Sequence, residues 1–86
     1  MKIIKNPFVV EKYQGEDLYL ILDNNVHILT GITPFIWEKI GPGISRKELL
    51  EIILDEYDVV EKKADKDLSK VLKKLKFINV LESIDE

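Results

Sequence analysis

The sequence predicts an α+β domain in which an N-terminal three-stranded antiparallel sheet packs on three helices. Apolar residues alternate or cluster in short, β-branched runs before Thr30, and they recur with a helical period after it. A chain of 86 residues is long enough for one hydrophobic core and too short for two. We therefore expect a single domain over residues 1–86, with the sheet at about 8–29 and helices at about 34–40, 46–57 and 62–76.

Two segments and the turns that follow them begin the predicted sheet. Residues 8–13 are β-branched and aromatic, and residues 14–17 after them have the composition of a turn. Residues 18–22 form an apolar run that is too short for a confident helix, and residues 23–25 tolerate the positive φ of a tight turn. This part of the sequence therefore indicates two strands with a turn after each.

The third strand, residues 26–29, is short and apolar, and it lies where the chain leaves the sheet. Because side chains alternate along a strand, His27 and Leu29 share one face, and Val26 and Ile28 share the other. This strand is the first candidate for a binding surface.

The first helix is predicted to start at Thr33 and Pro34. The Thr33 hydroxyl can accept an orphan N–H, and proline at the first helical position sacrifices no hydrogen bond. Trp37 is expected to pack this helix onto the sheet, since a Trp side chain buries a large apolar area. A proline between two glycines ends the helix. Ser45 and Glu48 then have the S-x-x-E spacing of a capping box, which predicts the start of the second helix.

The third helix carries an apolar stripe at the spacing i, i+3, i+4 and i+7, formed by Leu68, Val71, Leu72 and Leu75. Asn79 is expected to cap its C-terminus in a left-handed conformation. Residues 77–81 could return as a short strand or pack as an irregular tail. Residues 83–86 are expected to fray.

Composition places the chain among soluble globular proteins, with 45% hydrophobic and 34% charged residues. It contains no cysteine, so disulfides and thiolate metal sites are not available. The apolar run after Lys2 and Lys5 is far shorter than the ~7 to 15 residues of a signal peptide, and no run approaches the ~20 residues of a membrane span. We expect a cytoplasmic protein without a membrane partner.

The formal net charge of −3 argues against a general affinity for phosphate backbones. Acidic side chains gather in residues 48–61 and lysines in residues 62–76. At ~100° per residue, the lysines that face away from the apolar stripe are Lys66, Lys70, Lys73 and Lys74. This face is consistent with a solvated surface, with a patch that attracts an acidic peptide or protein, or with a DNA-binding surface. Asp67 lies at the border of the stripe, where both a structural contact and a ligand contact remain open.

Few residues suit catalysis. His27 is the only histidine, so a second imidazole cannot complete a metal cluster or a catalytic pair. The glycines at 41 and 43 flank a proline and fit a helix stop, because a phosphate loop would need a backbone N–H there. The carboxylates of residues 48–61 have no apolar surroundings that would raise their pKa. We expect no enzyme activity, no metal and no cofactor.

Several core positions recur in an order and spacing known from one family. They are Val26-x-x-Leu29, Ile36-Trp37, Ser45 with Glu48-Leu49, Glu56-Tyr57-Asp58-Val59 and Asp67-Leu68-x-x-Val71-Leu72-x-x-Leu75. The chain resembles, from about Leu18 to Leu81, the PqqD-like domains, also called RiPP precursor peptide recognition elements, whose fold is similar to a winged helix-turn-helix. Asn25 and Asn79 stand where relatives usually have glycine, and both tolerate positive φ.

The resemblance implies a non-catalytic module that binds the leader segment of a ribosomally made precursor peptide. The leader adds as a further strand beside the third strand, against the third helix, and the module presents the precursor to a modifying enzyme, often a radical SAM protein. The implied peptide-binding residues are Val26, His27, Ile28, Leu29 and Thr30 on the strand edge, and Lys63, Asp67, Lys70, Val71 and Lys74 on the helix. Independently of the resemblance, a free strand edge offers unpaired N–H and C=O groups to an extended peptide.

Two other functions stay open at this point. The first alternative is a small winged-helix DNA-binding protein. The net charge, the acidic second helix and the lack of Arg, Asn or Gln on the third helix argue against it and against a nucleic-acid partner. The second alternative is a structural subunit that binds only a larger enzyme. We expect a monomer, or a weak dimer through the strand edge.

Overall fold

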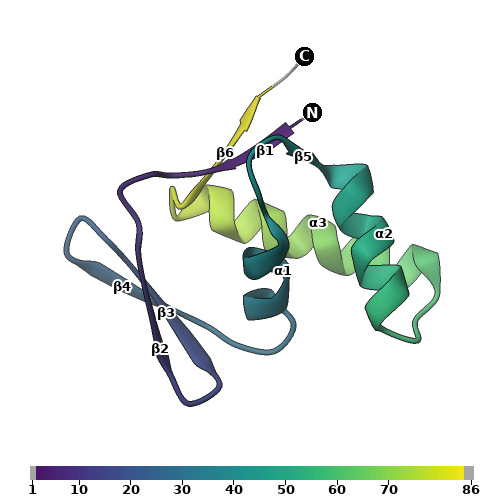
Figure 1. Ribbon diagram of the computed structural model, residues 1–86, viewed down its shortest axis with the longest axis horizontal. Coiled ribbons are helices and arrows are strands. Elements are labelled where there is room, and N and C mark those ends of the chain that lie inside the picture. Colours follow the sequence, from purple (N-terminus) through teal and green to yellow (C-terminus); the bar gives the residue numbers. More distant parts are fainter. Residues whose placement is uncertain (1, 85–86) are drawn as a thin grey trace.

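Two small antiparallel sheets and three helices make up the fold over residues 2–84, the part of the chain that the computed structural model describes (Figure 1). One sheet has the strand order β2-β3-β4, and the other has the order β5-β1-β6. The strands are β1 (Lys2–Lys5), β2 (Val10–Gln14), β3 (Asp17–Leu22), β4 (Asn25–Leu29), β5 (Ile44–Ser45) and β6 (Leu81–Ile84). The helices are α1 (Thr33–Lys39), α2 (Arg46–Glu56) and α3 (Glu61–Phe77).

The predicted N-terminal sheet is confirmed as β2-β3-β4, in which each strand is antiparallel to the next. The first hairpin turns at residues expected from the sequence, whereas Asn25, which was expected in the second turn, already belongs to β4. Gly15 has φ +65° in the first turn, and Asp23 and Asn24 have φ 50° and 67° in the second. Leu18 and Leu20 of the central strand are fully buried, so one face of the sheet covers the core.

The first strand of this sheet begins at Val10 rather than at the predicted Phe8, because the chain around Phe8 forms a turn. The Phe8 N–H donates to the Asn6 side-chain oxygen at 2.9 Å. Asn6 is itself anchored to the end of α3, since its side-chain amide donates to the Asn79 carbonyl and its backbone N–H donates to the Val80 carbonyl, each at 2.9 Å. Asn before proline favours turn initiation, and that preference outweighs the strand propensity of Phe8.

The three predicted helices are confirmed within one residue at each end. The predicted capping role of Thr33 is wrong: Ile32 occupies the capping position without a side-chain hydrogen bond, and Thr33 is already helical. The helix starts earlier because Gly31, with φ +64°, turns the chain so that the Thr33 N–H donates to the Thr30 carbonyl. The predicted capping box at the start of α2 is confirmed in both of its hydrogen bonds.

The sheet β5-β1-β6 joins three segments that are far apart in the sequence, and the sequence did not predict β1 or β5. Its strands pair Lys2 with Ser45 on one side and Lys2 with Ile84 on the other. A strand does follow α3, but it covers residues 81–84 and shares only Leu81 with the segment 77–81 for which a strand was one of two alternatives. Asn79 has the expected left-handed φ of 66°. The expected fraying of residues 83 and 84 is wrong, because both pair with β1. Residues 85 and 86 lie outside the described part.

One hydrophobic core joins both sheets to the helices. Trp37 is 1% exposed, which confirms its predicted packing role. Val71, which was predicted in the core stripe of α3, packs at the margin and is only partly buried. The buried residues are Ile3, Leu18, Leu20, Leu22, Leu29, Ile36, Trp37, Ile40, Leu49, Ile53, Ala64, Leu68, Leu72, Leu75, Val80 and Leu81.

The order α1, β5, α2, α3, β6 gives the helical half a winged helix-turn-helix-like topology, with β1 between the two strands β5 and β6. Residues 57–60 connect α2 to α3. Figure 1 places the sheet β5-β1-β6 and the sheet β2-β3-β4 on different sides of α3. The helix α3 thus has two borders, and each faces a different sheet.

Candidate functional site

The strand β4 stands at one edge of its sheet. It pairs with β3 from Asn25 to Leu29, and no strand of the described residues pairs with its other side. An unpaired edge of this kind exposes backbone donors and acceptors that a further strand can use. The short third strand expected from the sequence is therefore an open edge in the structure.

The register tells which backbone groups point outward. A two-residue turn at Asp23 and Asn24 connects β3 to β4, and the residues that flank such a turn exchange hydrogen bonds with each other. Bonding alternates from there, so Asn25, His27 and Leu29 direct their N–H and C=O groups toward β3. The N–H and C=O groups of Val26 and Ile28 point to the free edge.

The side chains of β4 alternate as predicted. Leu29 is buried and His27 is half-buried on the inner face, whereas Val26 and Ile28 are 57% and 51% exposed on the outer face. The side chains of an added strand would alternate in the same way, so one set would lie beside His27 and Leu29 and the other beside Val26 and Ile28. The apolar character of Val26 and Ile28 gives the edge hydrophobic neighbours for such side chains.

The strand ends at Leu29, and Thr30 lies beyond it. The Thr30 carbonyl accepts the Thr33 N–H at 3.2 Å, and Gly31 at φ +64° then redirects the chain into α1. Thr30 is exposed. Of the five predicted edge residues, Thr30 is thus the one that the turn into α1 takes out of the strand.

Two of the predicted helix residues contact each other on α3. The Lys63 ammonium lies 3.4 Å from the Asp67 carboxylate, one helical turn away, and the Asp67 side chain is 41% exposed. Asp67 also lines a cavity of about 70 Å³ whose other walls include Ile32 of the β4–α1 connection and Tyr57 at the end of α2. Asp67 therefore has a structural contact while one side of it faces a small apolar cavity.

The other predicted helix residues lie further along α3. Val71 packs at the edge of the core, to which Leu29 of β4 also belongs. Lys70 and Lys74 are exposed, and among the described residues neither ammonium group has a hydrogen-bond or ion-pair partner. The strand edge and this wall of α3 thus share a core, but no polar contact of the described residues joins them.

The β2 side of the sheet, opposite to the β4 edge, is attached to α1 by contacts that the sequence did not predict. The Trp37 indole N–H donates to the Glu11 carboxylate, and the Tyr13 hydroxyl donates to the Glu38 carboxylate. The Lys5 ammonium lies 4.5 Å from the centre of the Trp37 ring and 3.6 Å from Glu11. For these contacts the sequence indicated only that Glu11 and Tyr13 share one face of a strand.

These contacts change the pKa of Tyr13. The hydrogen bond to Glu38 raises the pKa of Tyr13 to about 12, and burial and the negative charges of Glu38 and Glu11 act in the same direction. The β2 side of the sheet is thus held to α1, whereas no strand of the described residues pairs with the β4 side. The sheet is anchored on one side and open on the other.

The described residues provide little for catalysis or metal binding. No group of three or more His, Cys, Asp or Glu residues in residues 2–84 is arranged to hold a metal ion. The acidic side chains of α2 and of the connection after it are exposed, as predicted for a solvated face. Within the same range no helix combines the length and the apolar character needed to cross a membrane.

Fold and site together define a small, winged helix-turn-helix-like α+β domain with an open strand edge. One solved structure that resembles it is TbiB1 in complex with the TbiA(beta) leader peptide, at a TM-score of 0.82 and 23% sequence identity over 100% of both chains. At this identity the similarity shows a common fold. No protein-family model and no curated protein matches the chain.

Proposed function

We propose that this chain is a non-catalytic peptide-binding domain of the cytoplasm. It captures the leader segment of a ribosomally synthesised precursor peptide as a fourth strand on β4, and it presents the precursor to a modifying enzyme such as a radical SAM protein. The whole chain acts as one domain, as a monomer or weak dimer, and without a cofactor. The proposed contact residues are Val26, His27, Ile28, Leu29 and Thr30 on the edge, and Lys63, Asp67, Lys70, Val71 and Lys74 on α3.

The observation that carries the proposal is the open edge of β4 in this particular fold. TbiB1, whose fold the chain shares along its whole length, was solved with a leader peptide. An edge with outward N–H and C=O groups at Val26 and Ile28 gives an extended peptide main-chain hydrogen bonds, and the neighbouring side chains give selectivity. The resemblance of the core positions to precursor peptide recognition elements supports the same function.

Magnitudes indicate which contacts decide affinity. Covering the exposed half of Val26 or Ile28 contributes about 1 kcal/mol each, as half of the value for a whole aliphatic side chain. An exposed ion pair with Lys70 or Lys74 contributes roughly 0.2 to 1 kcal/mol. We therefore expect apolar leader residues to anchor the peptide and acidic ones to tune it.

The proposal is tested most simply by the variant Ile28→Pro. The Ile28 N–H points to the free edge, so proline removes a donor for the added strand and spares the ladder between β3 and β4. The probes are fluorescein-labelled synthetic leader segments of any short peptides that are encoded beside this chain's gene. We expect one of them to bind the wild type and Ile28→Pro to weaken that binding at least about tenfold, the equivalent of one or two main-chain hydrogen bonds with a steric clash, measured by fluorescence polarisation.

The matched control is Ile28→Thr, which is also β-branched and keeps the N–H. It should bind within about threefold of the wild type, and both variants should retain the helical circular dichroism spectrum. Wild-type affinity in Ile28→Pro would contradict strand addition at β4. Failure of every leader segment to bind the wild-type protein would contradict the function itself.

The lysine face of α3 is the observation that favours the DNA-binding alternative. Lys66, Lys70 and Lys74 are exposed on a helix that follows a helix-turn-helix connection. Against this function stand the net charge of −3 and the exposed carboxylates of α2, which would approach the phosphates. Retardation of duplex DNA at physiological ionic strength, with a steep salt dependence, would favour the alternative.

A further inference from the structure

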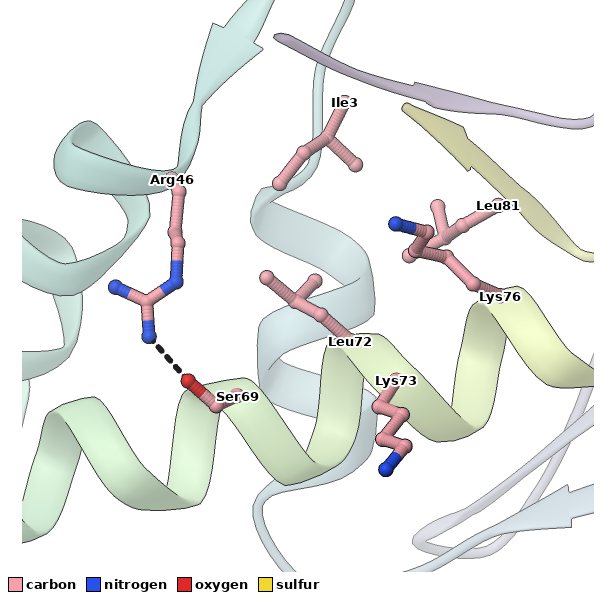
Figure 2. A pocket seen from close by; sticks show the side chains of 7 residues that line it. All are labelled: Ile3, Arg46, Ser69, Leu72, Lys73, Lys76 and Leu81. Atoms are coloured by element: carbon pink, nitrogen blue, oxygen red, sulfur yellow. Dashed lines mark hydrogen bonds between the residues drawn. The ribbon is translucent and has the colours of Figure 1, made fainter. Parts of the chain in front are cut away.

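A second concave surface lies on the other border of α3, away from β4. It is a cavity of about 240 Å³ between α3, the start of α2 and the sheet β5-β1-β6 (Figure 2). Its floor is apolar and consists of Ile3 from β1, Leu72 from α3 and Leu81 from β6. These three side chains belong to the core, so the floor is a fixed part of the fold.

The rim of the cavity is cationic. Arg46, Lys73 and Lys76 line it together with Ser69, and no carboxylate of residues 2–84 does, although the chain as a whole carries a net charge of −3. Figure 2 shows the Lys76 side chain reaching over the floor beside Leu81, whereas Lys73 extends along the outer side of α3. Neither ammonium group has a hydrogen-bond or ion-pair partner among the described residues. An unneutralised positive potential therefore lies directly beside an apolar floor.

Arg46 gives this rim a fixed position. Its guanidinium donates to the Asp65 carboxylate at 2.6 Å, to the Asp65 carbonyl at 3.0 Å and to the Ser69 hydroxyl. These bonds join the first residue of α2 to α3 and neutralise Arg46 in part. The free cationic charge at the rim is thus that of Lys76 over the floor and of Lys73 on the outer side of α3.

The size of the cavity indicates what kind of occupant fits it. Sites for small molecules usually measure about 300 to 1,000 Å³, so a cavity of about 240 Å³ fits one or two side chains better than a metabolite. An apolar floor with the Lys76 ammonium over it and Lys73 at its outer rim is complementary to an apolar side chain that has a carboxylate next to it. We propose that this cavity docks an acidic, apolar segment of a partner protein.

This docking site is separate from the β4 edge. At ~100° per residue, Lys73 lies about 200° around α3 from Val71, and Ser69 lies about 200° from Asp67, so the two borders face opposite ways. A leader on β4 and a protein segment in the cavity can therefore be bound at the same time. If the proposed function holds, the partner is the modifying enzyme; that assignment alone rests on the leader function.

The test uses the whole chain and a defined probe, an acetylated and amidated tetrapeptide of alternating leucine and glutamate. We expect this peptide, titrated to millimolar concentration, to shift the backbone ¹⁵N–¹H signals of Ser69, Lys73 and Lys76. The signals of Val26 and Ile28 should not move. The same tetrapeptide with glutamine in place of glutamate should bind at least about fivefold more weakly, because it forms no ion pair.

Two double variants and one control locate the effect. Lys73→Glu with Lys76→Glu should abolish the shifts, and the neutral pair Lys73→Gln with Lys76→Gln, which sets no negative charge at the helix C-terminus, should weaken binding at least about fivefold. The control Lys66→Glu reverses the charge of one lysine on α3 outside the cavity and should leave the affinity within about twofold. All three should bind a leader segment like the wild type, which separates this site from the proposed leader site.

Three results would overturn the docking site. The first is the absence of shifts at the cavity at millimolar peptide. The second is equal binding of the glutamine peptide, and the third is an equal loss of affinity in Lys66→Glu, which would indicate a general attraction to the lysine face.

Discussion

The two sheets of this small domain are built in opposite ways. The sheet β2-β3-β4 uses one continuous stretch of chain and two tight turns, whereas β5-β1-β6 gathers residues 2–5, 44–45 and 81–84. The first sheet ends in an open edge at β4 and is attached to α1 on its other side through Trp37 and Tyr13. The second closes the helical half, because β1 pairs both with β6 at the other end of the described chain and with β5 before α2. The difference separates a surface that can accept a strand from a scaffold that holds α3 in place.

The surfaces beside the two sheets also differ in chemistry. The β4 edge offers backbone hydrogen bonds between apolar side chains, and the ammonium groups of Lys70 and Lys74 lie on the same border of α3 as Val71. The cavity beside β5-β1-β6 offers an apolar floor with Lys73 and Lys76 at its rim and no strand edge among its lining residues except Leu81. The first surface suits an extended peptide, and the second suits a short acidic segment.

The largest expected effect breaks the core that joins the two sheets. Leu20→Ala in β3 and Ile3→Ala in β1 each remove a buried side chain, and each should lower the free energy of unfolding by about 2 to 5 kcal/mol. Because one core spans both sheets, urea unfolding should show one transition for each variant, with a slope close to that of the wild type. A second transition in Ile3→Ala would mean that β5-β1-β6 unfolds on its own.

A smaller effect concerns the scaffold side alone. Arg46→Met keeps the aliphatic stem but removes the hydrogen bonds to Asp65 and Ser69, and it should lower the free energy of unfolding by about 1 kcal/mol. This loss is small for a charged hydrogen bond because the Arg46 and Asp65 side chains are 28% and 49% exposed. The control is Lys47→Met at the exposed neighbouring position, which should stay within about 0.5 kcal/mol of the wild type. Equal urea midpoints for the two variants would contradict a stabilising role of the Arg46 hydrogen bonds.

The smallest effect concerns the attachment of the open sheet to α1. Tyr13→Phe should cost about 0.5 kcal/mol at neutral pH, since the hydrogen bond to Glu38 is exposed. The pKa of Tyr13 is raised from 10.0 to about 12 in the folded state, so the protonated phenol stabilises the fold fully below pH 10 and this contribution is lost as pH rises through 12.

Phenolate absorbance checks this assignment. The native wild-type protein should show a tyrosine titration step near pH 12 that the Tyr13→Phe variant lacks. Superimposable titration curves for the two proteins would contradict the contact between β2 and α1.

The sheet β2-β3-β4 and the helices could be predicted because their signals are local. The turn residues Gly15 and Asn24, and the capping box of Ser45 and Glu48, determine nearby backbone without reference to the rest of the chain. The sheet β5-β1-β6 lacks such signals. A strand of four residues such as β1 has no period of its own, and its partners lie about 40 and 80 residues away, so only tertiary pairing defines it.

The candidate site divides in the same way. The alternation that exposes Val26 and Ile28 followed from the strand period, and the helical period placed Lys70 and Lys74 outside the core. The cavity beside the second sheet could not be predicted, because its lining comes from β1, α2, α3 and β6 and depends on the missed pairing. The helical period indicated only that Lys73 is exposed, as it did for Lys70 and Lys74, so nothing in the sequence distinguished it from them.

Amide hydrogen exchange at β4 tests the central claim most directly. In the free protein the N–H groups of Val26 and Ile28 should exchange rapidly, and that of His27, which points toward β3, should exchange slowly. A bound leader segment should slow the exchange of Val26 and Ile28 at least about tenfold and leave the amides of β1 and β6 unchanged. A leader that binds while Val26 and Ile28 keep their rapid exchange would contradict strand addition at β4.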